Sequence, residues 1–371
     1  MAKKNFSFTI GMQFTIEDLK DEMNQQFINL YSNYYLNQNF NQEEFINKAH
    51  VFFNENKNNF VAHDSFFNNF TILTKHFSKE GKLYAVEKIW RFALEIVYKW
   101  ELKNPSQRIH KGSPYHFLGV TYLLFKDYMS GFLLIHQALE EDKKTQNKDH
   151  PYTPGYYFVT LNYDKSVYGQ ELLKNIADYL NLKILEYKKD RSGSLTIDEF
   201  KKNFLEQEKN IDIVFSFVYL LFNLNKLETG IRREFIKNDF ASLLEVGLIL
   251  DLCLIIDSVI KAKDSKTYFK EHFDFLCKKK LLSEDLNKRV NEVNKQFNIA
   301  PEQALGSLLE ENFFFSDNTK PKMADGDFLI TYCLRNYSAH NIKSRKIIYE
   351  RFFEIVKRIL NALFFTVEKV I

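Results

Sequence analysis

The scarcity of helix-breaking residues is the feature that most constrains what this chain can fold into. Its 371 residues include only 12 Gly and 6 Pro, and apolar residues recur at three- and four-residue spacing over long stretches. Gly and Pro mark turns, whereas this spacing gathers apolar side chains on one face of a helix. The pattern therefore predicts an all-α protein.

Apolar spacing divides the first half of the chain into helices separated by turn residues. The predicted N-terminal helices are 16–36, 42–56, 64–78, 82–103, 114–127 and 131–146. The strongest break is segment 147–155, which holds two Pro and a Gly. Segment 156–161 fits either a short strand or the start of a helix, 168–182 fits a helix, and 189–194 fits a turn or loop. Thr196 and Glu199 have the spacing of a capping box that opens the next helix.

The second half of the chain is more regular and predicts an up-and-down helical bundle. Its predicted helices are 211–227, 232–262, 267–280, 283–297, a short one from Pro301, one after the loop 316–326, and 344–369. Gly230 is a plausible helix stop. These elements suggest a helical region at 1–150, a connecting region at 151–204 and a C-terminal bundle at 205–371.

One part of the N-terminal region has a repeat-like pattern of large and small residues. Tyr115, Leu118, Gly119 and Tyr122 are followed by Gly131, Ile135 and Ala138. This spacing resembles a tetratricopeptide repeat, and the small residues would let two antiparallel helices pack closely. The alternative is an ordinary helical hairpin, because only one copy is clear and the repeat family needs several stacked units.

Charge, cysteine usage and hydropathy exclude several classes of protein. The chain has 51 basic and 48 acidic residues, a net charge of +3, so nucleic-acid contact would have to be local. Cys253, Cys277 and Cys333 are far apart and lie in apolar or helical settings, as reduced core thiols do. The most apolar segment, 246–257, is too short for a membrane span and is interrupted by Asp251. We expect a soluble cytoplasmic protein that does not contact a membrane.

Chemistry is indicated most sharply near the C-terminus. Arg335-Asn336-Tyr337-Ser338-Ala339-His340 places a guanidinium and an imidazole five residues apart. Arg offers fixed donors to a phosphate, and the pKa of His is close to neutrality, which suits proton transfer. This pair of side chains is sufficient to cleave RNA.

The sequence around this hexapeptide resembles the HEPN family of ribonucleases. Asn336 follows the Arg directly, an apolar run (328–334) leads in, and an amphipathic segment follows. The resemblance covers roughly the last 165 residues, and the hexapeptide is its only specific part. It implies metal-free RNA cleavage with no cofactor, in which Arg335 holds the phosphate, His340 moves protons and Asn336 binds the phosphate or orients the pair. Attack by the 2′-OH would leave a 2′,3′-cyclic phosphate.

Helix geometry sets a condition on this site. Residues five apart on an uninterrupted helix differ by about 140° around its axis, so Arg335 and His340 would point to different sides. Either the helix loosens around Ser338–Ala339, or a second copy of the motif completes the site. The chain has no second motif of this kind, so the second alternative predicts a homodimer.

Basic residues just beyond the His are candidates for RNA contact. Lys343, Arg345 and Lys346 would guide the RNA backbone, or they are simply the solvated start of a helix. Family resemblance further implies a toxin or phage-defence effector. The N-terminal region would then sense or restrain the ribonuclease and bind an activator or inhibitor.

Three alternatives remain open at this stage. One is a non-catalytic scaffold that binds a protein or peptide through the repeat-like region, and another is a HEPN-like bundle that binds a nucleotide without cleaving it. In the third, Arg335 makes a salt bridge with an acidic neighbour and His340 caps a helix end in an inactive bundle. A polar cluster at His110, Lys111, Gly112, Tyr115 and His116 lacks metal-ligand spacing and carboxylates, so a packed or surface cluster is expected there.

Overall fold

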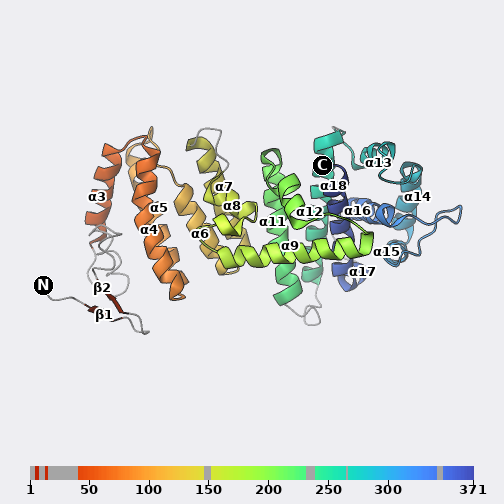
Figure 1. The fold of residues 1–371 in the computed structure, drawn as a ribbon, viewed down its shortest axis with the longest axis horizontal. Coiled ribbons are helices and arrows are strands. Elements are labelled where there is room, and N and C mark those ends of the chain that lie inside the picture. The colour runs from red at the N-terminus through yellow and green to blue at the C-terminus, as the bar shows by residue number, and fades with distance from the viewer. Residues whose placement is uncertain are drawn as a thin grey trace. The chain divides into compact units, whose positions relative to one another are not determined.

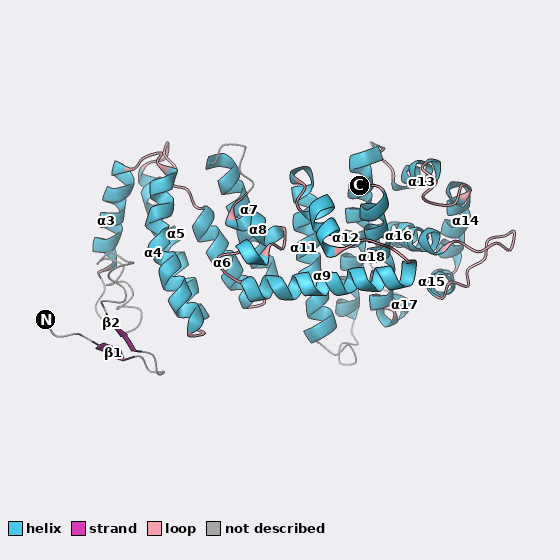
Figure 2. Ribbon diagram, in the orientation of Figure 1, coloured by secondary structure: helices cyan, strands magenta, loops and turns pink. Residues whose placement is uncertain are grey.

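The prediction of an all-α fold is confirmed. The computed structural model describes residues 5–7, 13–15, 41–145, 152–230, 239–264, 266–340 and 346–371. Helices make up nearly all of the regular structure (Figures 1 and 2). The strands in the described residues are β1 (Asn5–Ser7) and β2 (Gln13–Thr15), which pair antiparallel. The predicted helix 16–36 lies outside the described residues.

The chain divides into two compact units. Unit 1 comprises 1–158 and 162–172, and unit 2 comprises 159–161 and 173–371. The helices of unit 1 are α3 (Gln42–Glu55), α4 (Phe60–Lys79), α5 (Leu83–Lys103), α6 (Gly112–Leu124), α7 (Tyr128–Thr145), most of α8 (Pro154–Val159) and the 3-10 turn η1 (Tyr163–Lys165). Segment 156–161, for which a strand or a helix start was expected, contributes to helix α8.

Unit 1 has a strongly aromatic core centred on Trp90 of α5. The Trp90 ring stacks on Phe117 of α6 with ring centroids 4.8 Å apart, and its Nε1 donates a 2.7 Å hydrogen bond to Thr74 Oγ1 of α4. A buried Trp needs a partner for its N–H, and Thr74 supplies it. These contacts fix α4, α5 and α6 against one another.

The close packing expected for the small residues of the repeat-like segment is observed between α6 and α7. A Cβ on Gly119 would lie 2.9 Å from the carbonyl oxygen of Gly131, and a Cβ on Gly131 would lie 2.9 Å from that of Gly119. Both distances are too short for a side chain. The backbones of the two helices therefore meet at a point where only Gly fits.

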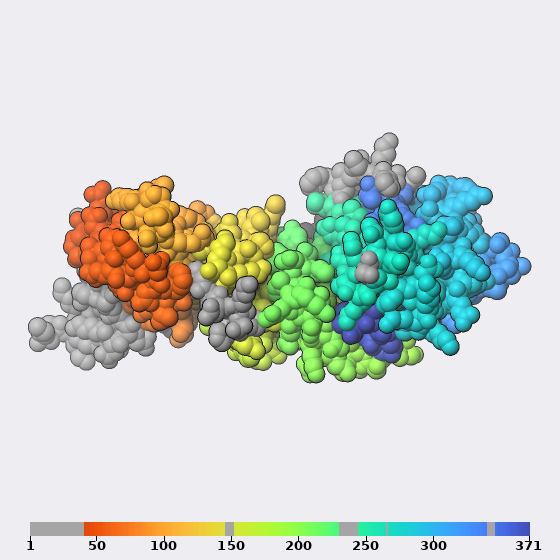
Figure 3. Space-filling model, turned by 90° about the horizontal axis from the view of Figure 1, so that it is seen from above, coloured from red at the N-terminus to blue at the C-terminus, as the bar shows by residue number. Residues whose placement is uncertain are grey.

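Unit 2 contains the predicted C-terminal helices. Its elements are most of α9 (Gln170–Arg191), α10 (Ile197–Phe200), the π-turn η2 (Lys201–Leu205), the 3-10 turn η3 (Glu208–Asn210), α11 (Ile211–Gly230), α12 (Asp239–Asp264), α13 (Phe269–Lys278), α14 (Leu286–Ile299), α15 (Pro301–Leu309), α16 (Met323–His340), α17 (Lys346–Glu350) and α18 (Phe352–Lys369). The capping box of Thr196 and Glu199 is present, and α11 ends at Gly230. Helix α16 packs against both α12 and α18, and Figure 3 shows the cyan residues of α12 and α13 forming a continuous surface with the blue C-terminal helices.

Three helix boundaries in unit 2 differ from the expected ones. Helix α9 continues to Arg191, past the expected end at 182 and into segment 189–194, which was expected to be a turn or loop. Helix α16 begins at Met323, inside the segment expected to be a loop, because Asp325 accepts hydrogen bonds from the backbone N–H of Lys322 and of Ser283. The expected helix 344–369 is two helices that meet at Arg351. The guanidinium of Arg351 bonds both Glu310, after α15, and Glu354 of α18 at this junction.

A buried ionic network anchors the start of α16. Asp327 accepts 2.7 and 3.0 Å hydrogen bonds from Arg191 of α9 and a further one from Arg358 of α18. Buried carboxylates require such pairing because removal from water is costly. The three cysteines of the chain are buried and free, as expected. None of the helices in the described part of the chain is both long and apolar enough to cross a membrane.

Candidate functional site

Helix α16 carries the Arg335–His340 hexapeptide on an unbroken helical backbone. The helix continues through Ser338 and Ala339 to its last residue, His340, so the expectation that it loosens there is wrong. Positions 335 and 340 are thus about 140° apart around the axis. The side chain of His340 lies outside the described part of the structure. Of the two alternatives for a shared site, a second copy of the chain remains.

Arg335 keeps most of its hydrogen-bonding capacity. Its side chain is 33% exposed, and its Nη2 lies 3.7 Å from Asp257 Oδ2 on α12, which is an ion pair but longer than a hydrogen bond. Its Nη1 donates to Asn336 Oδ1 at 3.3 Å, and its Nε is buried without an acceptor among the described residues. A guanidinium has five N–H donors. Arg335 can therefore still bind a phosphate.

A second polar atom of the hexapeptide is also unsatisfied. The hydroxyl oxygen of Ser338 is buried and has no hydrogen-bond partner within the described ranges. Ser338 follows Arg335 by three residues, so the two side chains share a side of α16. Buried polar groups without partners are rare in native proteins and call for an explanation. Both atoms are buried, so a ligand could reach only the exposed part of the Arg335 side chain.

The structure adds a group of charged residues behind Arg335 that the sequence did not indicate. Buried His272 of α13 lies between two carboxylates of α12, with Nε2 3.0 Å from Asp257 Oδ1 and Nδ1 2.9 Å from Asp264 Oδ2. Burial lowers the pKa of His272, but the hydrogen bonds to the two carboxylates outweigh burial and raise the pKa above its ordinary value. The only hint in the sequence was Asp257, a charged residue within an otherwise apolar stretch of α12.

The other predicted RNA-binding residues lie at the start of α17 or before it. Lys343 and Arg345 are outside the described residues. Lys346 is exposed, opens α17 and lies 3.4 Å from Glu350. Its contact with RNA stays a prediction.

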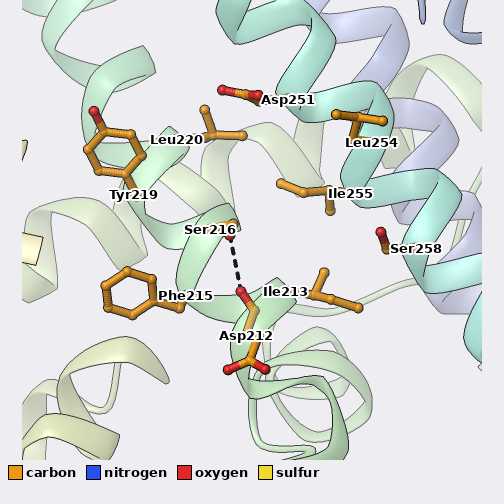
Figure 4. A pocket seen from close by; sticks show the side chains of 10 residues that line it. All are labelled: Asp212, Ile213, Phe215, Ser216, Tyr219, Leu220, Asp251, Leu254, Ile255 and Ser258. Carbon is orange, nitrogen blue, oxygen red and sulfur yellow. Dashed lines mark hydrogen bonds between the residues drawn. The ribbon is translucent and has the colours of Figure 1, made fainter. Parts of the chain in front are cut away.

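A groove in unit 2 is separate from Arg335. It has a volume of about 420 Å³, and its lining residues all belong to α11 and α12. Figure 4 shows Asp251 and Asp212 at opposite ends of the view, with apolar Ile213, Leu220 and Ile255 between them. Burial raises the pKa of Asp251. The groove supplies no basic group, so it is unsuited to a phosphate.

The polar cluster of unit 1 is packed, which confirms one of the two expected alternatives. His110 is buried, and its Nε2 lies 3.0 Å from Asp142 Oδ1 on α7. Burial lowers the pKa of His110 to about 4 and raises that of Asp142 to about 7. Lys111 is buried too, and its Nζ donates to Glu101 at 2.6 Å. No group of three or more metal-ligating side chains occurs in the described residues.

Comparisons of the chain with protein-family models, curated proteins and solved structures found no match.

Proposed function

We propose that this protein is a metal-independent endoribonuclease whose active site is completed by two copies of the chain. The observation that carries the proposal is Arg335, a third exposed, with its Nε unpaired in the described structure and its Nη2 only loosely paired with Asp257. Ser338 adds a second unsatisfied polar atom beside it. The exposed part of the Arg335 side chain would offer donors to a phosphate group.

The proposed reaction is transfer of the phosphate from the 5′-oxygen to the adjacent 2′-oxygen. The 2′-OH attacks phosphorus as its proton is removed, the bond from phosphorus to the 5′-oxygen breaks, and the leaving oxygen takes up a proton. His340 would move these protons, and Arg335 would stabilise the charge that builds on the phosphate oxygens. Asn336, which already accepts a hydrogen bond from Arg335, would orient the guanidinium. The products are a 2′,3′-cyclic phosphate and a 5′-OH.

The geometry of α16 supports the proposal of a homodimer. Because the helix does not loosen between Arg335 and His340, one chain directs the two positions to different sides. An isologous two-fold contact would bring the Arg of one copy to the His of the other. A role as a toxin or phage-defence effector, with unit 1 binding an activator or inhibitor, is part of the proposal through the HEPN resemblance alone.

Cleavage of labelled RNA in excess EDTA tests the activity. We expect wild type to yield cyclic phosphate ends, Arg335→Ala and His340→Ala to be at least about a hundredfold slower, and Arg289→Ala to match wild type. Arg289 is the control because it is a half-buried Arg of the same unit whose donors are engaged by Asp285 and Asp317. Equal cleavage by all four proteins would rule the proposed site out.

Mixing the two inactive variants tests whether the site is shared. Arg335→Ala and His340→Ala chains that exchange subunits would form dimers with one complete Arg and His pair. We expect about a quarter to a half of wild-type activity, by statistical pairing of subunits. If the mixture stays inactive while both variants are shown to form mixed dimers, one chain must supply both groups.

The ion pair of Arg335 with Asp257 favours a second candidate, a bundle without catalytic activity. In that case Arg335 serves only to join α16 to α12, and Arg335→Ala lowers the thermal stability of unit 2 while no RNA is cleaved by any variant. Peptide capture that depends on Tyr115 and Tyr122 would then point to the scaffold role.

A further inference from the structure

His272 is a buried histidine whose two ring nitrogens both face carboxylates. It is 1% exposed, and both of its acceptors, Asp257 and Asp264, come from α12. Ionised carboxylates only accept hydrogen bonds. With both carboxylates ionised, both ring nitrogens donate and the ring is an imidazolium, which is the protonation state that the test below measures.

Aromatic packing holds His272 in place. Phe269 and Phe273 of α13 both contact the ring of Tyr332 on α16, with centroids 5.9 and 5.6 Å apart. The same helix that carries Arg335 therefore also fixes the helix that carries His272. An imidazolium held in this way cannot leave its carboxylates without displacing α13 from α16.

Asp257 stands between two cations. Its Oδ1 is 3.0 Å from His272 Nε2, whereas its Oδ2 is 3.7 Å from Arg335 Nη2. The charges alternate along Asp264, His272, Asp257 and Arg335, and buried Cys253 also faces this row, where burial raises its pKa. The closer partner of Asp257 is His272, so that carboxylate is occupied mainly by the imidazolium.

We propose that His272 is a positioning residue for Arg335: it holds Asp257 and offsets its charge, so that Arg335 keeps its positive potential for a phosphate. If His272 were neutral, the whole charge of Asp257 would compete with the phosphate for the same guanidinium. The assignment of the phosphate to RNA rests on the proposed function. The alternating charges of Asp264, His272, Asp257 and Arg335 do not depend on it, because they are contacts within the structure.

The first arm of the test needs no RNA. Nitrogen NMR of histidine-labelled full-length protein reports whether both His272 ring nitrogens carry protons, and we expect the imidazolium signature at pH 7.5. Arg335→Ala should raise the pKa of His272, because Asp257 then loses its other cation, and Arg289→Ala should leave it unchanged. Inorganic phosphate should shift the His272 signal in wild type and not in Arg335→Ala. A neutral His272, or one indifferent to Arg335, overturns the inference.

The second arm measures the affinity for 2′-O-methyl RNA, which cannot be cleaved. We expect His272→Gln to weaken binding about tenfold, within the usual range of coupling between sites, and Asp257→Asn to bind at least as well as wild type. In the Asp257→Asn background, His272→Gln should have no further effect. Structural damage alone would persist in both backgrounds, and circular dichroism checks that each variant is folded.

The outcomes separate the two proposals. If wild type binds RNA and His272→Gln binds equally well, the positioning role is wrong and the proposed function stands. When wild type neither binds nor cleaves RNA, the proposed function is wrong, and the response of His272 to inorganic phosphate decides whether it positions Arg335.

Discussion

Each unit contains a buried histidine beside two carboxylates, and the pKa values of the two histidines are shifted in opposite directions. In unit 2, His272 has carboxylate oxygens at 3.0 and 2.9 Å on its two ring nitrogens. In unit 1, His110 has Asp142 at 3.0 Å, but its second carboxylate, Asp64, is 3.7 Å away, beyond hydrogen-bond distance. The same residue types are thus arranged so that the pKa of the histidine is raised in unit 2 and lowered in unit 1.

The two histidines differ in the hydrogen bonds and charges that oppose burial. The pKa of His110 is lowered to about 4, because burial and the positive charges of Lys111 and Arg108 outweigh the charge of Glu141, which raises it. Burial raises the pKa of Asp142 to about 7. At His272 the two hydrogen bonds overcome burial and raise the pKa. Carboxylates close to a histidine are not enough; each must reach a ring nitrogen.

The largest expected difference in the loss of unfolding free energy is between His272→Gln and His110→Gln. Removing the imidazolium leaves two carboxylates facing each other, which costs about 3 kcal/mol of unfolding free energy. Loss of the neutral hydrogen bond at His110 costs about 1 kcal/mol. Hydrogen exchange of the amides of α13 and of α6 at pH 7 measures each unit in the intact chain. Equal losses would show that the two sites have the same charge.

A smaller difference in stability is expected between substitutions at Gly112, which packs tightly against His110, and at Gly247, which does not contact other residues at its Cβ position. A Cβ at Gly112 would overlap both Asp142 and His110, so Gly112→Ala should destabilise unit 1 by about 2 kcal/mol in thermal unfolding. Gly247→Ala is the matched control in unit 2, because nothing lies within 4 Å of its Cβ position and Ala favours a helix by about 1 kcal/mol. If Gly112→Ala stabilises unit 1 instead, the side chains of His110 and Asp142 can shift to accommodate a methyl group.

The units should also respond to pH in opposite directions. Burial lowers the pKa of His116 in unit 1 from 6.5 to about 3, and neither ring nitrogen has a partner in the described structure. Its contribution is present above pH 6.5 and is lost as the pH falls, by about 2 kcal/mol at pH 5. The raised pKa of His272 has the opposite sign, because its stabilisation is complete below pH 6.5 and is lost as the pH rises through the folded-state pKa.

Unfolding at pH 5, 7 and 9 measures this response. His116→Phe should remove its own share, about 2 kcal/mol at pH 5, from the acid sensitivity of unit 1, since a phenyl ring fits among Phe117 and Phe158 and cannot be protonated. If unit 1 of the wild-type protein is as stable at pH 5 as at pH 7, the predicted contribution of His116 is wrong.

The smallest effect is expected at Asp64. Its side chain is 48% exposed and does not reach hydrogen-bond distance of His110, so Asp64→Asn should change stability by less than about 0.5 kcal/mol. Its counterpart Asp264 is 7% exposed and bonded to His272, and Asp264→Asn should cost about 1.5 kcal/mol. Urea unfolding of both variants compares them. If Asp64→Asn and Asp264→Asn lower the unfolding free energy equally, the distance between carboxylate and histidine does not explain the difference between the two sites.

The helices were predictable because each depends on spacing within a short stretch of chain. The capping box of Thr196 and Glu199 is one such local signal. The break at Arg351 was not predictable, since apolar residues continue at helical spacing across it, through Ile348, Phe352 and Ile355. The cause lies in contacts with Glu310, 41 residues away.

The candidate site was predictable only in its local part. Arg335, Asn336 and His340 share one helix and are visible as a hexapeptide. The partners Asp257 and His272 lie 78 and 63 residues earlier in the chain, as their numbers show, and only the packing of α12 and α13 brings them to Arg335. No spacing rule connects residues on different helices.

Both tryptophans of the chain belong to helix α5, where Trp90 and Trp100 are buried among aromatic rings. Tryptophan fluorescence therefore reports on unit 1 alone, whereas far-ultraviolet circular dichroism sums the helices of both units. Recording the two signals during a single melt of the uncut chain would tell which unit loses its structure first.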